Sequence, residues 1–334
     1  MAVRETAVQN WAGGINNRAA TNRIPEGFAR DMLNLDPGAL LKSRIGYEQV
    51  AAGTDCRAVM ALNDKVLYAD GTALMVYDLS TNAATQIATI AGTGPVGWCV
   101  HNEELFISTV NETLRYNGTL RLWGVKDVTV QPQVNITGQK KGRRLYAMTY
   151  VNEHGEEGGT VSAANVPDGD YQFTVSNVPA GHKARIYVSA LNGKTLYLQR
   201  EVGADGVYTV SSPVTDSATL ATMHMSAPSP GEFLASTGAV LVTGGGKTVA
   251  CTEPLMPHLM DRSKRFFQYP SDVGFVLAGL YGVYVSSDKC YKIDGIETDN
   301  PSQRSVRDYP AFPGTGTLLP SGAATWVTRY GMAV

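Results

Sequence analysis

The segment from Val242 to Ala250 contains Gly-Gly-Gly-Lys-Thr, a string close to the loop that cradles nucleotide phosphates. In that loop four residues separate a first glycine from Gly-Lys-Ser/Thr, because the first glycine opens a wide turn whose amides point at the phosphates. Here Leu241 occupies the position of that first glycine. The following residues, Val249 to Thr252, are strand-like rather than helical. The spacing and the flanks therefore predict a glycine turn between two strands.

Histidine and cysteine side chains, which are frequent metal ligands and catalytic groups, are scattered along the chain. No His-Glu-x-x-His or Cys-x-x-Cys segment occurs, and no Gly-x-Ser-x-Gly segment marks a nucleophilic serine. We therefore expect no enzymatic activity, no cofactor and no metal. The simplest interpretation is loop or surface positions for the histidines and small buried thiols for the cysteines: His101, His154, His182, His224, His258, Cys56, Cys99, Cys251 and Cys290.

Acidic side chains gather in three places. Asp294, Glu297 and Asp299 could bind Ca²⁺, but they lack the spacing of a helix-loop-helix calcium site, and a solvated turn is the simpler interpretation. Glu103-Glu104 and Glu156-Glu157 are adjacent pairs. Neighbouring side chains in a strand point to opposite faces, so neither pair can act alone as the two carboxylates of a glycosidase.

The stretch Lys140-Lys141-Gly142-Arg143-Arg144 is the concentrated basic segment of the chain. We consider two interpretations of it: contacts with DNA phosphates or an acidic neighbouring subunit, and a solvated loop before a strand from Leu145 to Tyr150. Further candidate contacts, chosen only for their charge, are Arg18, Arg23 and Arg44. The tryptophans are interpreted as core or interface anchors, with a sugar-binding platform as the alternative: Trp11, Trp98, Trp123 and Trp326.

Composition favours an all-β protein. The 334 residues include 35 glycines and 16 prolines, and only 17% are charged, which is typical of many short strands joined by turns. The formal net charge of -2 does not indicate a general nucleic-acid binder. No apolar run reaches the roughly 18 residues of a membrane span, and no signal peptide is evident, so we expect synthesis in the cytoplasm of the producing cell.

A repeat organises the strands. Asn63 to Asp78 (NDKVLYADGTALMVYD) matches Asn102 to Asn117 (NEELFISTVNETLRYN) at an offset of 39 residues, and a third copy runs from Val283 to Gly295. Repeats of about 40 residues made of short strands are typical of β-propeller blades. Between the copies, residues 127–222 show alternating strands and frequent turns, which predict an immunoglobulin-like or fibronectin-III-like sandwich.

The ends of that middle region and the first 50 residues complete the predicted organisation. Ser226 to Phe233, rich in proline, is interpreted as a linker back to the blades. The N-terminal residues show little periodicity. There we predict an extended arm with one helix that has Pro25 and Glu26 in its first turn and ends at Asp36-Pro37-Gly38.

These segments together resemble the β-propeller tail proteins of tailed bacteriophages, the nozzle or head-tail stabilisation proteins beneath the portal ring of short-tailed phages. The resemblance extends over nearly the whole chain, through motifs that are blade or turn signatures without chemistry. They are GGINNRAATNRIPEGFARDMLNLD and LLKSRIGYEQV at the start, YAMTYVNEHGEEG and ARIYVSALNGKTLYLQREV in the middle, and CTEPLMPH, YPSDVGFVLAGLYGVYV, CYKIDG and AATWVTRYGMAV towards the end.

The resemblance implies a structural virion protein that forms a ring of identical copies in the tail and continues the DNA channel. Its partners would be itself, portal or adaptor and other tail proteins, and passing DNA bound without sequence preference. The alternative is a distal, receptor-contacting propeller that recognises a host glycan; a glycan-cleaving enzyme fits less well. The implied domains are an arm (1–50), blades (51–125), an inserted fibronectin-III-like sandwich (126–225) and further blades (226–334).

Overall fold

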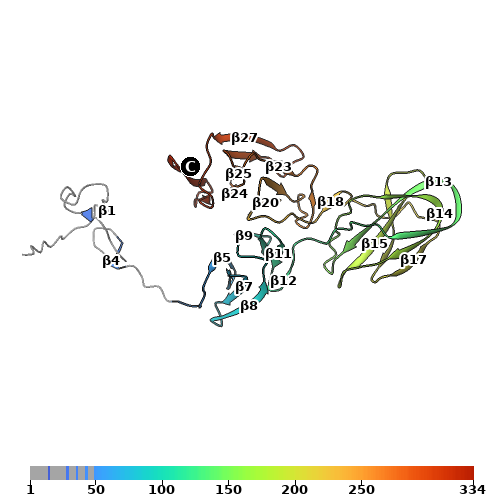
Figure 1. Cartoon of the computed structure of the whole chain (residues 1–334), viewed down its shortest axis with the longest axis horizontal. Coiled ribbons are helices and arrows are strands. Elements are labelled where there is room, and N and C mark those ends of the chain that lie inside the picture. The colour runs from blue at the N-terminus through green and yellow to red at the C-terminus, as the bar shows by residue number, and fades with distance from the viewer. Residues whose placement is uncertain (1–13, 16–27, 30–34, 37–41, 44–48) are drawn as a thin grey trace, which may run out of the picture. The chain divides into compact units, whose positions relative to one another are not determined.

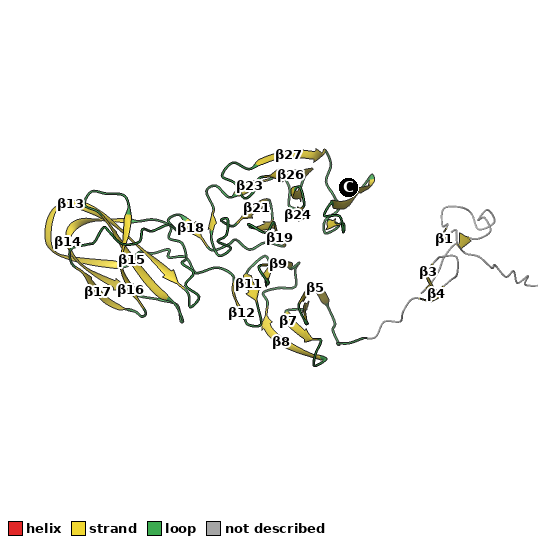
Figure 2. Cartoon of the chain, turned by 180° about the vertical axis from the view of Figure 1, so that it is seen from behind, coloured by secondary structure: helices red, strands yellow, loops and turns green. Residues whose placement is uncertain are grey.

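The computed structural model describes residues 14–15, 28–29, 35–36, 42–43 and 49–334 (Figure 1). The chain divides into two compact units, Met1–Ala52 and Gly53–Val334. All regular secondary structure in the described part of the chain is β-strand, so the predicted all-β class is confirmed (Figure 2). No helix long and apolar enough to cross a membrane occurs in these residues.

Two small strand pairs are described in the first unit. β1 (Gly14–Ile15) pairs in parallel with β2 (Phe28–Ala29), and β3 (Leu35–Asp36) pairs antiparallel with β4 (Lys42–Ser43). The predicted helix is therefore wrong at positions 28–29 and 35–36, and its remaining positions lie outside the described residues. It was predicted from start and stop signals alone, and an isolated helix of this length without an amphipathic stripe is marginal in water.

The second unit contains four antiparallel sheets of four strands each and a fifth sheet of three strands, which we call blades 1 to 5. Each is an antiparallel meander of short strands, and in blade 3 residues 252–265 separate the third strand from the fourth. The strands are β5 (Cys56–Leu62), β6 (Lys65–Asp70), β7 (Ala73–Asp78) and β8 (Ala83–Thr89) in blade 1; β9 (Gly97–His101), β10 (Glu104–Ser108), β11 (Thr113–Tyr116) and β12 (Leu120–Leu122) in blade 2; β19 (Phe233–Ser236), β20 (Leu241–Gly245), β21 (Thr248–Cys251) and β23 (Phe266–Gln268) in blade 3; β24 (Phe275–Gly279), β25 (Gly282–Ser286), β26 (Cys290–Asp294) and β27 (Ser302–Arg307) in blade 4; and β28 (Thr317–Leu318), β29 (Ala324–Thr328) and β30 (Gly331–Ala333) in blade 5.

The sequence repeat corresponds to the blades. Its three copies supply the second and third strands of blades 1, 2 and 4. The asparagine that begins each of the first two copies lies in the preceding hairpin turn, where Asn63 has φ 54° and Asn102 has φ 48°. Asparagine tolerates this left-handed conformation better than most residues, which is why it recurs there. The predicted glycine turn is also confirmed: β20 and β21 form a hairpin closed at the Gly245–Thr248 pair.

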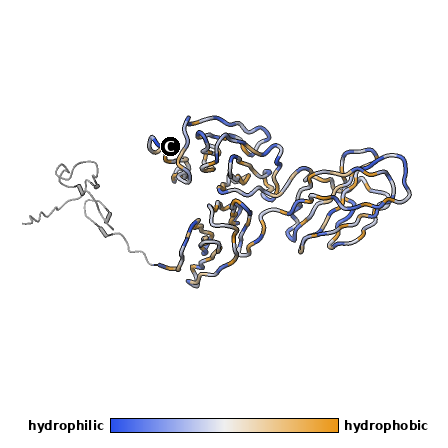
Figure 3. Tube along the Cα trace, in the orientation of Figure 1, coloured by the Kyte–Doolittle hydropathy of each residue, from blue (hydrophilic) through white to orange (hydrophobic). Residues whose placement is uncertain are grey.

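Successive blades pack through apolar side chains, and in β9 every second residue is buried. Hydrophobic and hydrophilic residues alternate over short distances along the blades (Figure 3). Met60, Leu67 and Leu74 of blade 1 meet Leu105 and Ile107 of blade 2. Blade 2 packs directly on blade 3, although residues 123–232 separate them in the chain. Gly97 allows this approach, because a Cβ there would lie 2.8 Å from the backbone of residues 232–234. The described fold is therefore propeller-like.

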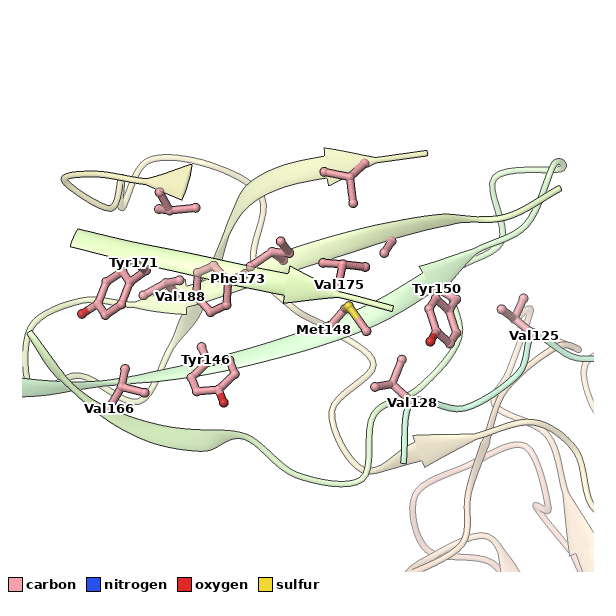
Figure 4. Close-up of a cluster of buried hydrophobic side chains, with 14 residues drawn as sticks. Val125, Val128, Tyr146, Met148, Tyr150, Val166, Tyr171, Phe173, Val175 and Val188 are labelled. Carbon is pink, nitrogen blue, oxygen red and sulfur yellow. The ribbon is translucent and has the colours of Figure 1, made fainter. Parts of the chain in front are cut away.

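The intervening segment forms one five-stranded antiparallel sheet in the order β16-β15-β13-β14-β17. Its strands are β13 (Gln133–Val151), β14 (Ala164–Val175), β15 (Lys183–Ser189), β16 (Leu196–Val202) and β17 (Gly206–Val210). A two-stranded ladder of β18 (Met225–Ser226) and β22 (Met260–Asp261) joins the returning chain to blade 3. The sheet has its own core, in which Tyr146, Met148 and Tyr150 of β13 face Tyr171 and Phe173 of β14 (Figure 4).

This sheet is strongly bent at β13. From the pair Thr137–Asp170 to the pair Arg143–Pro167, β13 advances six residues while β14 advances three. The extra residues are bulges, and bulges bend a strand and increase its twist. A single bent sheet therefore encloses a hydrophobic core, which in a sandwich would lie between two packed sheets. The prediction of a two-sheet sandwich differs from the structure in this respect.

Candidate functional site

The histidines are less exposed than predicted. His101 is 4% exposed and its Nδ1 lies 2.9 Å from Ser236 Oγ in blade 3, so it is a packing residue between blades. His258 is largely buried, whereas His154 and His224 are exposed as predicted. Burial lowers the pKa of both His101 and His258. Within residues 49–334, no three side chains of the metal-binding types converge on one point.

The acidic cluster after β26 is divided by positive partners. Asp294 lies 2.6 Å from Lys292 Nζ and 3.6 Å from Arg304 Nε, and Asp299 lies 3.4 Å from Arg265 Nη2. Each of these two carboxylates therefore serves a different ion pair. Glu297 and Asp299 are exposed, as expected for a solvated turn.

Three of the four cysteines are buried, as predicted, but Cys56 is exposed. Burial raises the pKa of the Cys99 thiol to about 12 and that of Cys251 to about 11. Among the tryptophans, Trp123 and Trp326 are core residues, Trp98 is 38% exposed, and Trp11 lies outside the described residues. Trp123 is fully buried where the chain leaves blade 2, and its Nε1 donates to the Pro257 carbonyl at 2.6 Å.

A group of charged residues joins blade 2 to the five-stranded sheet, and we call it the ionic junction: Arg115, Glu104, Arg121, Asn152, Glu156 and His258. Arg115, from β11, is only 3% exposed. Its guanidinium donates to both carboxylate oxygens of Glu156, with Nη1 to Oε1 at 2.8 Å, and Nη1 lies 3.7 Å from Glu104. A bidentate pair of this kind fixes direction as well as distance.

Further partners hold Glu156 in place. Asn152 Nδ2 donates to Glu156 Oε2 at 2.7 Å, and His258 Nδ1 lies 3.9 Å from Oε1. Burial alone would raise the pKa of Glu156, but the hydrogen bonds from Arg115 and Asn152 outweigh it, so the pKa lies below its ordinary range. The carboxylate is therefore ionised at neutral pH and remains paired with Arg115.

The adjacent Glu157 points to the five-stranded sheet, away from blade 2, as the alternation of neighbouring side chains predicts. Its Oε1 accepts from Thr149 Oγ1 at 2.5 Å and from Tyr187 Oη at 2.6 Å, and its Oε2 accepts from Arg185 Nη1 at 2.8 Å. All three donors belong to the five-stranded sheet. Two consecutive carboxylates thus attach one loop to blade 2 and to the sheet.

The two chain segments that connect the sheet to the blades also lie side by side. Asp127 Oδ1, on the outgoing segment, accepts from the Ala227 amide on the returning segment at 2.7 Å. The loop after Glu157 contacts both, because the Val128 amide donates to Gly159 and the His224 amide donates to Thr160. These bonds and the ionic junction restrict rotation of the sheet relative to blades 2 and 3.

Arg115 was not among the predicted site residues, although the repeat contains a signal for it. At the offset of 39 residues, Arg115 aligns with Val76, which is a buried residue of blade 1, and in the third copy its position holds Lys292. A cation at a blade position that is buried in another copy requires a partner of opposite charge, as Lys292 has in Asp294. The sequence does not reveal that the partner is Glu156, since the contact joins two different folding units.

The predicted basic segment lies within β13 rather than in a loop before Leu145. It occupies the bend, where β13 carries its extra residues. Lys140, Lys141 and Arg143 are exposed, whereas Arg144 is partly buried, with Nε 2.6 Å from Asp168 Oδ1 and Nη1 2.8 Å from the Ser189 carbonyl. The predicted contacts Arg18, Arg23 and Arg44 lie outside the described residues.

A groove of about 580 Å³ lies between blades 3 and 4. The β24–β25 hairpin forms one wall with Leu280 and Tyr281, which are 70% and 66% exposed. The lining also includes Thr237, from the β19–β20 turn of blade 3, and Glu297, which follows β26 in blade 4. The groove therefore combines an exposed aromatic ring with polar side chains.

Comparisons with known proteins leave the family open. No family model matches the chain, and no curated protein matches it. Among solved structures, Saccharomyces cerevisiae Sqt1 is similar with 11% identity and a TM-score of 0.23, covering 82% of this chain and 93% of Sqt1. The computationally designed Ika8 protein has 10% identity and a TM-score of 0.26 over 88% and 86% of the two chains. A chain of the Mitotic Checkpoint Complex has 8% identity and a TM-score of 0.25 over 88% and 98%.

Proposed function

We propose that this chain is a structural protein of a tailed-bacteriophage virion that forms an oligomeric ring in the nozzle or head-tail connector region of the tail and continues the DNA channel. The observation that carries the proposal is the attachment of the five-stranded sheet to the blades. The two hydrogen-bonded connecting segments and the bidentate Arg115–Glu156 contact suit a rigid structural protein.

The proposed organisation is an arm (1–50), blades (51–125 and 226–334) and an inserted domain built on the five-stranded sheet (126–225). Blades stacked face to face bury their apolar surfaces and give a stiff wall, while the inserted domain offers a second surface for neighbours. Copies of one chain that contact each other head to tail close into a ring when the rotation between them fits. The partners would be further copies, portal or adaptor proteins, and DNA that passes without sequence-specific binding.

Cryo-electron microscopy of the particle that contains this chain tests the proposal. A ring of copies below the portal, with the chain traced around an axial channel, is the expected result. A position at the distal end of the tail, or a single copy beside a fibre, would refute the conduit function.

A second candidate function is recognition of a host surface glycan by a distal propeller. The groove with Tyr281, Thr237 and Glu297 favours it, because an exposed aromatic ring flanked by hydroxyl and carboxylate groups suits a sugar. The same micrographs separate the two candidates by position. A glycan array then tests the second directly, with Tyr281→Ala expected to abolish any binding.

A further inference from the structure

The bend of β13 presents a cluster of positive charge, which we call the basic corner: Lys140, Lys141, Arg143 and Lys194. The first three lie in the bulged part of β13 and Lys194 lies in the turn between β15 and β16; all four are exposed. Bend and turn are joined by two hydrogen bonds between Arg143 and Asn192. The Asn192 amide donates to the Arg143 carbonyl at 2.7 Å, and the Arg143 amide donates to Asn192 Oδ1 at 3.0 Å.

The backbone at this corner is shaped for the bend. Gly142 has φ 112°, a conformation that other residues rarely adopt, and a Cβ there would lie 2.6 Å from Leu191 Cδ1. The bend requires extra residues and two glycines with positive φ, Gly138 at 60° and Gly142, but it does not require cations. Any exposed polar residue would serve at positions 140, 141 and 143, so the accumulation of charge needs another explanation.

The nearby ion pair separates Arg144 from the rest of the cluster. Asp168 is directed to Arg144, which also reaches across to β15. Within residues 49–334, Arg144 forms an ion pair, whereas Lys140, Lys141, Arg143 and Lys194 form none. The four cations of the corner keep their charge available to a partner.

We propose that the basic corner docks on the phosphate backbone of duplex DNA, without reading its sequence. This inference rests on the proposed function, since a wall of a DNA channel meets duplex DNA. The chemistry of the corner favours a duplex over single strands. Neither the bend (138–143) nor the turn (190–195) contains an aromatic residue, whereas binding of single strands depends on aromatic rings that stack on bases.

The corner also lacks the apolar contacts that anchor a segment in a lipid surface. Leu191, 46% exposed, is the large apolar side chain in the bend and turn, and it packs beside Gly142. Neutralising phosphates with four cations predicts a slope of about -3.6 in log K against log salt, or roughly 100-fold weaker binding between about 50 and 200 mM salt. Such binding is weak enough to let DNA slide.

Fluorescence anisotropy of the full chain with a labelled duplex of about 30 bp, in salt from about 50 to 200 mM, tests the proposal. K140Q/K141Q/R143Q/K194Q should weaken binding at least ~10-fold at the lowest salt and flatten the salt dependence. The matched control K126Q/K247Q/K264Q/R329Q removes the same charge from exposed positions elsewhere and should stay within about twofold of wild type.

Several outcomes would overturn the docking proposal. They are equal losses in the two variants, no binding by the wild type, and corner-dependent binding that is tighter to phosphatidylserine vesicles or polyglutamate than to DNA. If the quadruple variant does not fold, K140Q/K141Q carries the test with about half the effect in log K. If the chain binds DNA through the basic corner but lies outside the tail, the proposed function is refuted and the docking is not. If the chain forms the ring but does not bind DNA, the docking is refuted and the proposed function is not.

Discussion

The substitution Glu156→Gln tests whether the ionic junction holds the five-stranded sheet to blade 2. Glutamine keeps the shape of the side chain and one acceptor oxygen, but it removes the charge that faces Arg115. Arg115 is 3% exposed, and its nearest remaining carboxylate is Glu104 at 3.7 Å. The substitution therefore leaves a buried guanidinium with one distant counter-charge.

The magnitude follows from this burial. Removing one partner of a buried ion pair costs about 3–5 kcal/mol, because the other charge stays buried without compensation. The Glu156 side chain is 20% exposed and Glu104 is still present, so the cost should be lower, at about 2–3 kcal/mol. If the loss is local, amide exchange in residues 152–158 should accelerate by about 30- to 150-fold.

Urea unfolding followed by tryptophan fluorescence measures the global effect, because Trp123 is buried beside the junction, and hydrogen exchange measures the local one. Glu153→Gln is the matched control: the same loop loses the same charge, but Glu153 is 73% exposed and its ion pair is with the neighbouring His154. We expect less than about 0.5 kcal/mol for the control. An E156Q protein that behaves like E153Q in both measurements would refute the role of the junction.

Two further predictions concern titration and reactivity. Burial lowers the pKa of His258 and His101 below the ordinary 6.5, and the bonds to Arg115 and Asn152 lower that of Glu156 below 4.5, so protonating any of these three groups destabilises the fold. The urea midpoint should therefore fall as the pH drops from about 7 to about 5 through protonation of the two histidines, and it should fall further as Glu156 protonates. H258Q should remove the share of His258 and make the first part less steep, and an unchanged slope would contradict the assignment. A thiol reagent should modify one cysteine of the folded chain, Cys56, and all four after unfolding, because Cys99, Cys251 and Cys290 are buried; C56S should then show no rapid reaction, and a second fast thiol in the folded wild type would show that a blade opens.

The blades were predictable because each is a local structure. Asn63 and Asn102 begin equivalent hairpins, and the offset between them gives the strand spacing without any knowledge of tertiary contacts. The turn at Gly245 to Thr248 was predictable for the same reason, since three glycines and strand-like flanks decide it locally. The N-terminal helix failed at its described positions because capping signals alone do not stabilise a helix.

The candidate site was less predictable because its contacts join segments far apart in the chain. Alternation correctly predicted that Glu156 and Glu157 point apart, but it could not supply their partners in blade 2 and in the sheet. The basic segment was recognised from its composition, but its location within a bent strand was not predicted. Lys140 to Arg144 lie in a bulged part of β13, and a pattern with a period of two residues does not anticipate bulges.

The position of the five-stranded sheet between blades 2 and 3 explains why an insertion of this size leaves the blade packing intact. Its two connecting segments meet at the Asp127–Ala227 hydrogen bond, so the whole sheet is an insertion whose two ends are adjacent. The entropic cost of closing such an insertion grows only slowly with its length. Gly97 and Trp123 then let blade 2 pack against blade 3 as if the chain were continuous. Close ends alone would permit the sheet to swing. The Arg115–Glu156 and Arg185–Glu157 pairs act on consecutive residues of one loop, so a swing would have to break an ion pair on one side or the other.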